Sequence, residues 1–284
     1  MHYNDRGGCR LNGVGGDEGQ AAESQGSVGT NYGMITLEDL EAFSEDQLSD
    51  SGNGSLEEGE TIEEEQQDRL LHYWQDVGRG HRVEVPRDMA EPIQQITTNN
   101  NGTHPREAVP YILMSRKEKS GDVLYEKRQY EKGHWACITV KEDTYEQSIC
   151  YGFMKIMRYI CQQNSLGRYL GMTIPIVTVV NTDEMHTTLS RTVTVAYYLP
   201  INHQDQPPQP YDTEIVIEQW PATIVYTRPF TGATNEVTII SEINTMAEML
   251  DSPVVCVSDS FIVAGYTNPA AANRQNEIWF LERP

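Results

Sequence analysis

The hydrophobic and polar positions divide the chain into a polar first third and a patterned remainder. From about residue 109 onward, short runs rich in β-branched and aromatic residues alternate with turn residues, which is the pattern of strands. The expected strands are 123–130, 134–140, 172–180, 192–199, 213–219, 223–230, 261–266 and 277–281. Two longer segments, 144–163 and 235–250, carry apolar residues at helical spacing. The order strand–strand–helix–strand–strand therefore occurs twice, with a period of about ninety residues.

This element order predicts one α+β domain over residues 109–284. Two such pseudo-repeats would most simply merge into a single twisted or distorted β-barrel with two flanking helices. A domain of about 175 residues is large enough to bury a core of its own. The segment 199–211 is rich in proline and is expected to be a loop between the two halves.

Residues 1–104 are expected to form an acidic, largely disordered leader. They hold 21 Asp and Glu against six Arg and no Lys, so they contribute −15 of the chain's net charge of −21. They are also rich in Gly, Ser, Gln and Asn. Such a segment buries too little apolar surface to offset the entropy lost on ordering.

Two stretches of this leader could form short amphipathic helices, near 36–43 and 61–77. The second begins with a capping box, Thr61 with Glu64, and its apolar residues share one stripe. That stripe consists of Leu70, Leu71, Trp74 and Val77. A stripe of this kind could bind a partner protein, or it could pack on the chain's own domain, and the sequence leaves both open.

The remaining composition excludes several classes of function. A nucleic-acid partner needs a basic face, and the longest basic cluster is the short segment 115–119. Apolar stretches such as 174–180 are far shorter than the roughly 20 residues of a membrane span. Five irregularly spaced cysteines predict reduced thiols rather than a disulfide framework. With no apolar signal segment at the N-terminus, we expect a cytoplasmic protein. The sequence contains no HExxH, GxSxG, Walker or strand-linked GxGxxG motif, so we do not expect an enzyme.

Several strings in the second part of the chain resemble the SOUL/haem-binding-protein family. They are YEKRQY at 125–130 followed by Trp135, the helix at 148–160, MTIP at 172–175, PPQP at 207–210, AGY at 264–266 and NRQNEIW at 273–279. Their order and spacing over about 170 residues make the resemblance specific. It implies a distorted barrel of two pseudo-repeats. It also implies non-catalytic binding of haem or another tetrapyrrole on a shallow apolar surface beside the first domain helix, as an intracellular carrier or buffer.

Haem binding requires an apolar surface, cations for the propionates and, optionally, an axial ligand. In the helix 144–163, one apolar face is expected to join the core: Ile149, Phe153, Ile156 and Ile160. Cys150, Met154, Met157 and Cys161 share an adjacent face at the same spacing. Their soft, polarizable side chains would suit a planar ligand. This second stripe could equally pack against another part of the chain or a partner.

Cations near this face are the candidate partners of the propionates. They are Lys155, Arg158 and Arg168, of which arginine is the better clamp because it can form two parallel bonds to a carboxylate. His134 is a candidate axial ligand, although a lone strand histidine is more often structural. By the resemblance, a histidine proposed as ligand in one branch of the family falls at Gln129, so the ligand of the iron stays unassigned.

Two alternatives belong to other classes of protein. The first is a ligand-free interaction or regulatory protein on the same fold, acting through the acidic leader and its amphipathic helices. In its favour, basic positions of the family are replaced, one by Cys150 and one within 270–272. The second is an enzyme acting on tetrapyrroles, for which the sequence offers no identifiable general base.

Overall fold

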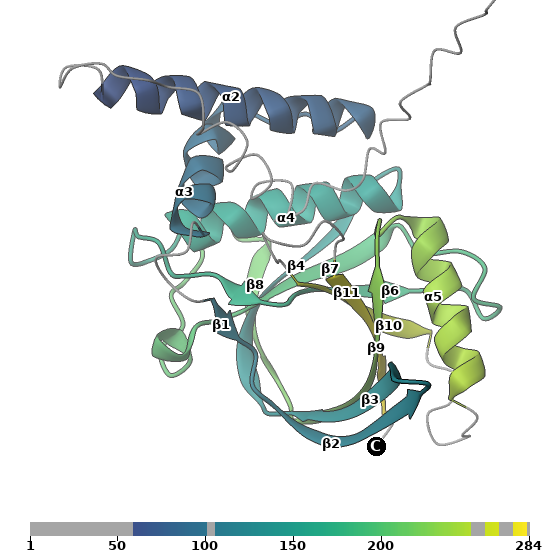
Figure 1. Ribbon diagram of the computed structural model, residues 1–284. Coiled ribbons are helices and arrows are strands. Elements are labelled where there is room, and N and C mark those ends of the chain that lie inside the picture. Colours follow the sequence, from purple (N-terminus) through teal and green to yellow (C-terminus); the bar gives the residue numbers. More distant parts are fainter. Residues whose placement is uncertain (1–58, 101–105, 251–258, 267–274, 283–284) are drawn as a thin grey trace, which may run out of the picture. The chain divides into compact units, whose positions relative to one another are not determined.

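The computed structural model of the protein describes residues 59–100, 106–250, 259–266 and 275–282 (Figure 1). The helices are α2 (Gly59–Gly80), η1 (Arg87–Met89), α3 (Ala90–Asn100), α4 (Tyr145–Cys161), η2 (Ile201–His203) and α5 (Glu236–Met249). The first strands are β1 (Glu107–Ala108), β2 (Tyr111–Lys119), β3 (Asp122–Tyr130), β4 (Gly133–Lys141), β5 (Thr173–Ile174) and β6 (Ile176–Asn181). The others are β7 (Thr192–Tyr198), β8 (Ile215–Trp220), β9 (Thr223–Thr231), β10 (Ser260–Tyr266) and β11 (Gln275–Leu281).

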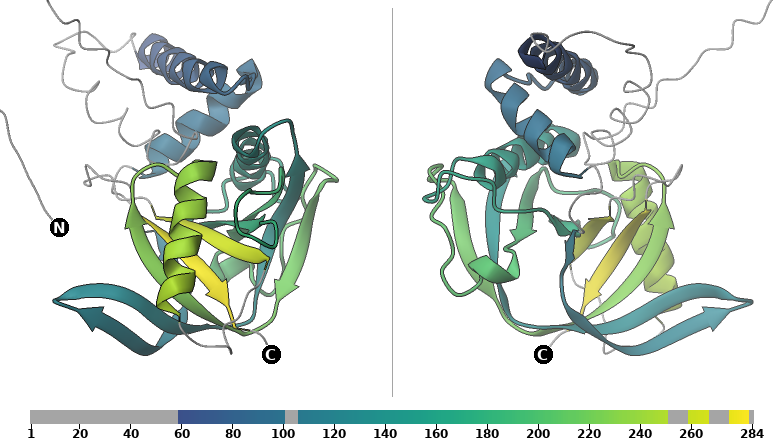
Figure 2. Two further views of the ribbon diagram at one scale, coloured as in Figure 1. Left: turned by 90° about the vertical axis from the view of Figure 1, so that its right-hand side faces the viewer. Right: turned by 60° about the vertical axis from the view of Figure 1, so that its left-hand side comes forward.

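Nine of these strands form one antiparallel sheet in the order β2-β3-β9-β11-β10-β6-β7-β4-β8. Strands β3 and β4 lie near opposite ends of this order, yet only residues 131–132 join them. The same holds for β8 and β9, which residues 221–222 connect. Because a two-residue connection bridges at most about 11 Å between the strand ends that it joins, the sheet has to curl until its ends approach each other. Figure 1 shows the resulting ring of strands, and Figure 2 shows β2 and β3 continuing beyond it as a hairpin.

The predicted internal repeat is confirmed, and the two halves exchange their first strands. The first half supplies β3, β4, α4, β6 and β7, and the second supplies β8, β9, α5, β10 and β11. The strands β9-β11-β10 of the second half have β3 of the first half as their outer neighbour. Likewise, the strands β6-β7-β4 of the first half have β8 of the second half beside them. The halves are thus interlocked in a single sheet, which is the merged α+β barrel that the element order predicts.

The core lies on both surfaces of the curled sheet, as the alternation of strand residues requires. On β4, Trp135 and Cys137 join a cluster inside the ring, whereas Ala136 and Ile138 pack outward against α4. The second helix, α5, packs on β11 and buries Ile239, Ile243 and Met246.

The helices ahead of the sheet differ from the sequence expectation in extent. The helix expected at 61–77 lies within α2, but α3 falls in a stretch for which the sequence predicts no helix. The apolar residues Leu70 and Trp74 of α2 are buried in the same cluster as residues of α4. Of the two alternatives for this stripe, packing on its own chain is therefore the one observed. The helix expected at 36–43 lies outside the described residues.

Two further differences between the expected and the observed elements concern strands. The single strand expected at 172–180 is divided at Pro175, which follows a cis peptide bond and separates β5 from β6. Strand β2 was not expected, because its residues 111–119 lack the alternation of a half-buried strand and all nine are exposed. None of the described helices combines the length and apolar character that crossing a membrane requires.

Candidate functional site

Helix α4 begins at a capped turn and lies tightly on the sheet. The side chain of Thr144 accepts a hydrogen bond from the backbone N–H of Gln147 at 3.1 Å, which satisfies one of the free donors at the helix start. Farther along, a Cβ added at Gly152 would lie 2.8 Å from a methyl of Val195 on β7. Glycine is therefore what allows the helix to approach β4 and β7 so closely.

Both apolar faces of α4 are buried. Ile156 and Ile160 belong to the layer between helix and sheet and are fully buried, as predicted for the core face. The second stripe differs from the expected shallow surface. Its members are Cys150, Met154, Met157 and Cys161, and each is at most 4% exposed.

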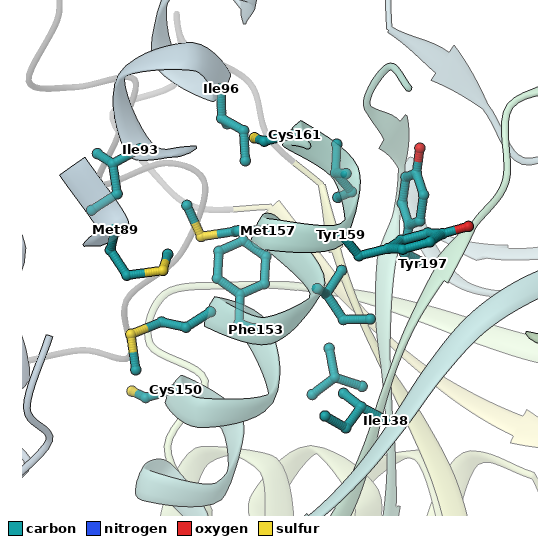
Figure 3. Close-up of a cluster of buried hydrophobic side chains, with 14 of the residues drawn as sticks. Met89, Ile93, Ile96, Ile138, Cys150, Phe153, Met157, Tyr159, Cys161 and Tyr197 are labelled. Atoms are coloured by element: carbon teal, nitrogen blue, oxygen red, sulfur yellow. The ribbon is translucent and has the colours of Figure 1, made fainter. Parts of the chain in front are cut away.

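The cover over the second stripe comes from the segment ahead of the sheet. Met89 at the end of η1, with Ile93 and Ile96 of α3, is fully buried in the same cluster as the stripe. Figure 3 shows Met89 and Ile93 on the side of α4 to which Met157 points, and Ile96 beside Cys161. A second layer, formed by α2, packs on α3. The apolar stripe that the sequence predicts is real, but a segment of the same chain covers it.

The pseudo-symmetric helix α5 lacks a second stripe of this kind. It buries three side chains along one face, whereas thirteen residues of α4 are buried. On its outer side α5 carries exposed residues such as Ser241, Asn244 and Val237. Because α4 and α5 occupy corresponding places in the two halves, the fold itself requires only one apolar face on such a helix.

The cations of α4 both have acidic partners. Arg158 is next to the stripe, and its Nη2 donates to both carboxylate oxygens of Asp88 on η1, at 2.9 and 3.0 Å. Lys155 lies farther round the helix and pairs with Glu214 and with Asp212, the latter at 3.4 Å. Of the predicted propionate partners, Arg158 is thus the one beside the covered face, and a carboxylate already occupies it.

The remaining predicted residues lie away from this cluster. Arg168 is exposed in the loop after α4. Burial lowers the pKa of His203, and the charge of Arg168 adds to this effect. His134 is on β4, and the amide of Gln204 bonds to both its backbone N–H and its carbonyl, at 2.7 and 3.1 Å. These backbone contacts join the start of β4 to the segment that follows β7, and they do not involve the imidazole of His134. Among the residues that the structure describes, no group of three His, Cys, Asp or Glu is arranged to hold a metal ion.

The thiol of Cys161 is protected as well as covered. Burial raises the pKa of Cys161 well above the ordinary value, and the charge of Glu91 adds to the effect. Its sulfur lies 3.5 Å from the carbonyl oxygen of Pro92, to which it donates. In this arrangement Cys161 is a neutral thiol, and only the thiolate is a good ligand for iron.

Comparison with known proteins identifies the fold's family. Residues 106–281, more than half of the chain, match the family model described as SOUL heme-binding protein. The chain belongs to this family. It is 28% identical to "Heme-binding protein 1" of Sus scrofa over 177 residues, which are 62% of this chain and 93% of that protein. It is also 28% identical to "Heme-binding protein 2" of Homo sapiens over 161 residues, covering 56% and 78%. The solved C-terminal domain of EcmrR aligns with 56% of the chain and 98% of that domain, at 12% identity and a TM-score of 0.38.

Inside the SOUL domain, the strings that carried the resemblance meet in one buried polar network. Arg128 of YEKRQY binds Glu126 of the same strand and Glu277 of NRQNEIW. Glu277 in turn accepts bonds from Tyr266 and from the indole of Trp279. Sequence patterns alone assign these residues no functional role. The signal from which they could have been found is the alternation of residues along β3 and β11, which directs these side chains into the ring.

Proposed function

We propose that this SOUL protein binds haem or another tetrapyrrole without catalysing a reaction, as a carrier or buffer. The macrocycle would lie flat on α4 over Met154 and Met157, with Cys150 and Cys161 at its margins. Arg158 would pair with a propionate. The observation that carries the proposal is the second apolar stripe of α4, which its counterpart α5 lacks.

The expected strength of binding follows from the area involved. Covering one porphyrin face removes on the order of 200 Å² of apolar surface from water, worth about 5 kcal/mol at roughly 25 cal/mol per Å². Association costs several kcal/mol of this. The affinity should therefore be modest unless the iron gains an axial ligand, for which Met157 and Met154 are the soft donors on the face.

The relatives support the same ligand class through their printed names, "Heme-binding protein 1" and "Heme-binding protein 2". The alternative, a ligand-free interaction protein acting through its amphipathic leader helices, is weakened by the packing of α2. Leu70 and Trp74, which would have to contact a partner, are buried within the chain.

Haemin titration of the full chain, followed at the Soret band, tests the proposal. The parent protein should saturate with one equivalent, and Met154→Glu should weaken binding at least about tenfold, because it places a carboxylate beneath an apolar ring. Met185→Glu is the matched control, since Met185 is 77% exposed in the loop between β6 and β7 and does not belong to the cluster around the stripe. It should bind like the parent.

A conservative variant separates loss of the site from loss of the fold. Met154→Leu keeps the face apolar and should retain haemin binding within about threefold. Arg158→Ala should cost about 1 kcal/mol of binding if its ion pair with the propionate is exposed. If Met154→Glu binds haemin as well as the parent does, the site is not on this face. If haemin produces no Soret shift with the parent, nor with a variant in which the cover over the stripe has been opened, the proposed function is wrong.

A further inference from the structure

The cover over the α4 stripe lies outside the SOUL domain. We call residues 59–100, which comprise α2, η1 and α3, the cap segment. The family match begins only at residue 106. The pig relative aligns over 93% of its own length with 177 residues of this chain, so it has almost no length left for a counterpart of the leader. A SOUL domain is therefore complete without the cap segment, and its contact with α4 is an addition in this chain.

The cap segment offers α4 the two features that a tetrapyrrole would offer. Its apolar side chains Met89, Ile93 and Ile96 cover the stripe, as a macrocycle would (Figure 3). Its Asp88 places a carboxylate on Arg158, as a propionate would. Both contacts come from η1 and α3, within nine residues of sequence. Residues 88–96 thus both cover the apolar face of α4 and pair with Arg158 beside it.

The cap contact carries buried donors that it leaves unsatisfied. The indole Nε1 of Trp74 and the Nε of Arg158 are buried without a hydrogen-bond partner among the described residues. The cap does form polar contacts with α4: Gln147 of α4 donates a hydrogen bond to the carbonyl of His81 at 3.0 Å. Asp88, which pairs with Arg158, keeps 61% of its side chain exposed. Unsatisfied donors weaken the closed arrangement relative to an open one, in which water reaches them.

We propose that the cap segment is a built-in competitor for the ligand site: cap docking and tetrapyrrole binding on α4 exclude each other. The inference rests on the proposed function and concerns the regulation of the same site. The apparent affinity for the ligand equals the intrinsic affinity reduced by the fraction of molecules whose cap is open. Conversely, bound ligand releases the cap segment from α4, because linkage acts equally in both directions.

A charge placed under the cap tests the proposal in the full chain. Ile93→Asp should open the cap because it buries an uncompensated carboxylate against α4. Haemin should then bind about ten- to hundredfold more tightly than to the parent. Gln95→Asp, which adds the same residue at a half-buried position of the same helix, should bind like the parent. Hydrogen exchange of residues 87–96 verifies that the cap has opened in the first variant only.

A milder variant guards against loss of the fold. Asp88→Asn removes the carboxylate that imitates a propionate but leaves the apolar cover in place, so haemin affinity should rise by about threefold. Hydrogen exchange of the parent provides an independent readout. Adding haemin should accelerate exchange in residues 87–96, whereas a lid that closes over its ligand would become more protected.

The outcomes separate the two proposals. If Ile93→Asp opens the cap but binds haemin no more tightly than the parent, or if haemin slows exchange in residues 87–96, the competitor inference is overturned while haem binding stands. If neither the parent nor the opened variant binds haemin, the proposed function fails and the inference with it. Tighter binding by Ile93→Asp and Asp88→Asn, with Gln95→Asp unchanged, supports both.

Discussion

The guanidinium of Arg128 on β3 forms two parallel hydrogen bonds with the carboxylate of Glu277 on β11, at 2.9 and 2.7 Å, across the intervening strand β9. Both side chains are about nine-tenths buried. Glu126 bonds to the same guanidinium, so one cation serves two carboxylates inside the ring. Strand β3 is one of the strands exchanged between the halves, and this network ties it to a strand of the other half.

Removing the cation should destabilise the domain severely. Arg128→Met leaves Glu277 buried without a cation, while Glu126 keeps only Arg116, and the free energy of unfolding should fall by about 3–5 kcal/mol. Replacing both members of the pair, as Arg128→Met with Glu277→Met, should recover much of this loss because no unpaired carboxylate of that pair remains. Urea denaturation followed by circular dichroism measures both.

An exposed ion pair supplies the control for this series. Arg79 and Asp76 pair on the surface of α2 at 2.8 Å, and Arg79→Met should change the unfolding free energy by less than about 1 kcal/mol. A loss for Arg128→Met no larger than that for Arg79→Met would contradict the view that the network secures β3.

Stability should fall in acid partly through Glu126. Burial alone would raise the pKa of this carboxyl, but hydrogen bonds and charges from Arg128 and Arg116 outweigh burial, so its pKa lies below the ordinary value. A lowered folded-state pKa contributes stability that is complete above the unfolded pKa, near 4.5, and is lost as the pH falls through the folded pKa. The parent should therefore exceed Glu126→Gln in stability at pH 7, and the gap should shrink progressively below pH ~4.5. A gap that is unchanged at pH ~2 would rule out this ionisation as its source.

Close contact between α4 and the sheet makes Gly152 sensitive to the smallest enlargement. Gly152→Ala should lower the unfolding free energy by about 1–3 kcal/mol because its methyl would overlap that of Val195. The second change Val195→Ala removes the overlapping methyl, so the double variant should be more stable than the additive sum of the two single changes predicts. Thermal denaturation of the four proteins completes this cycle, and simple additivity would mean that the helix shifts freely to admit the methyl.

Three described cysteines should be unreactive in the native protein. Cys137 faces the inside of the ring, and Cys150 and Cys161 lie beneath the cap segment. In a chain carrying Cys9→Ser and Cys256→Ser, a thiol reagent should therefore label none of them at pH 8 until denaturant is added. Rapid labelling of Cys150 or Cys161 in the native protein would show that the cap contact is open in solution.

Opening the cap should expose the two α4 thiols selectively. In the same background, Ile93→Asp should make Cys150 and Cys161 reactive, and loss of burial should bring the raised pKa of Cys161 back toward its ordinary value. Cys137 serves as an internal control, because the cap does not cover the inside of the ring. Equal labelling of Cys137 would indicate global unfolding instead.

Most elements of the sheet could be predicted because their signals are local. Periodicity of two in β4 and of 3.6 in α4 is visible within a dozen residues, and the doubled element order follows from it. The two missed elements lack such a local signal. Strand β2 has no buried face to impose alternation, and α3 has few apolar residues, whose role is set by their contact with α4.

The amino-acid order alone establishes that α4 carries two apolar faces, with a cation beside the second one. It also establishes the family, because the matching strings stand in order along the chain. What covers the second face was decided by packing between residues 89–96 and α4, some sixty positions apart. Likewise, the meeting of Arg128 with Glu277 depends on the curl of the whole sheet. Contacts of that range are selected by competition among all apolar surfaces for burial, so no local pattern specifies them.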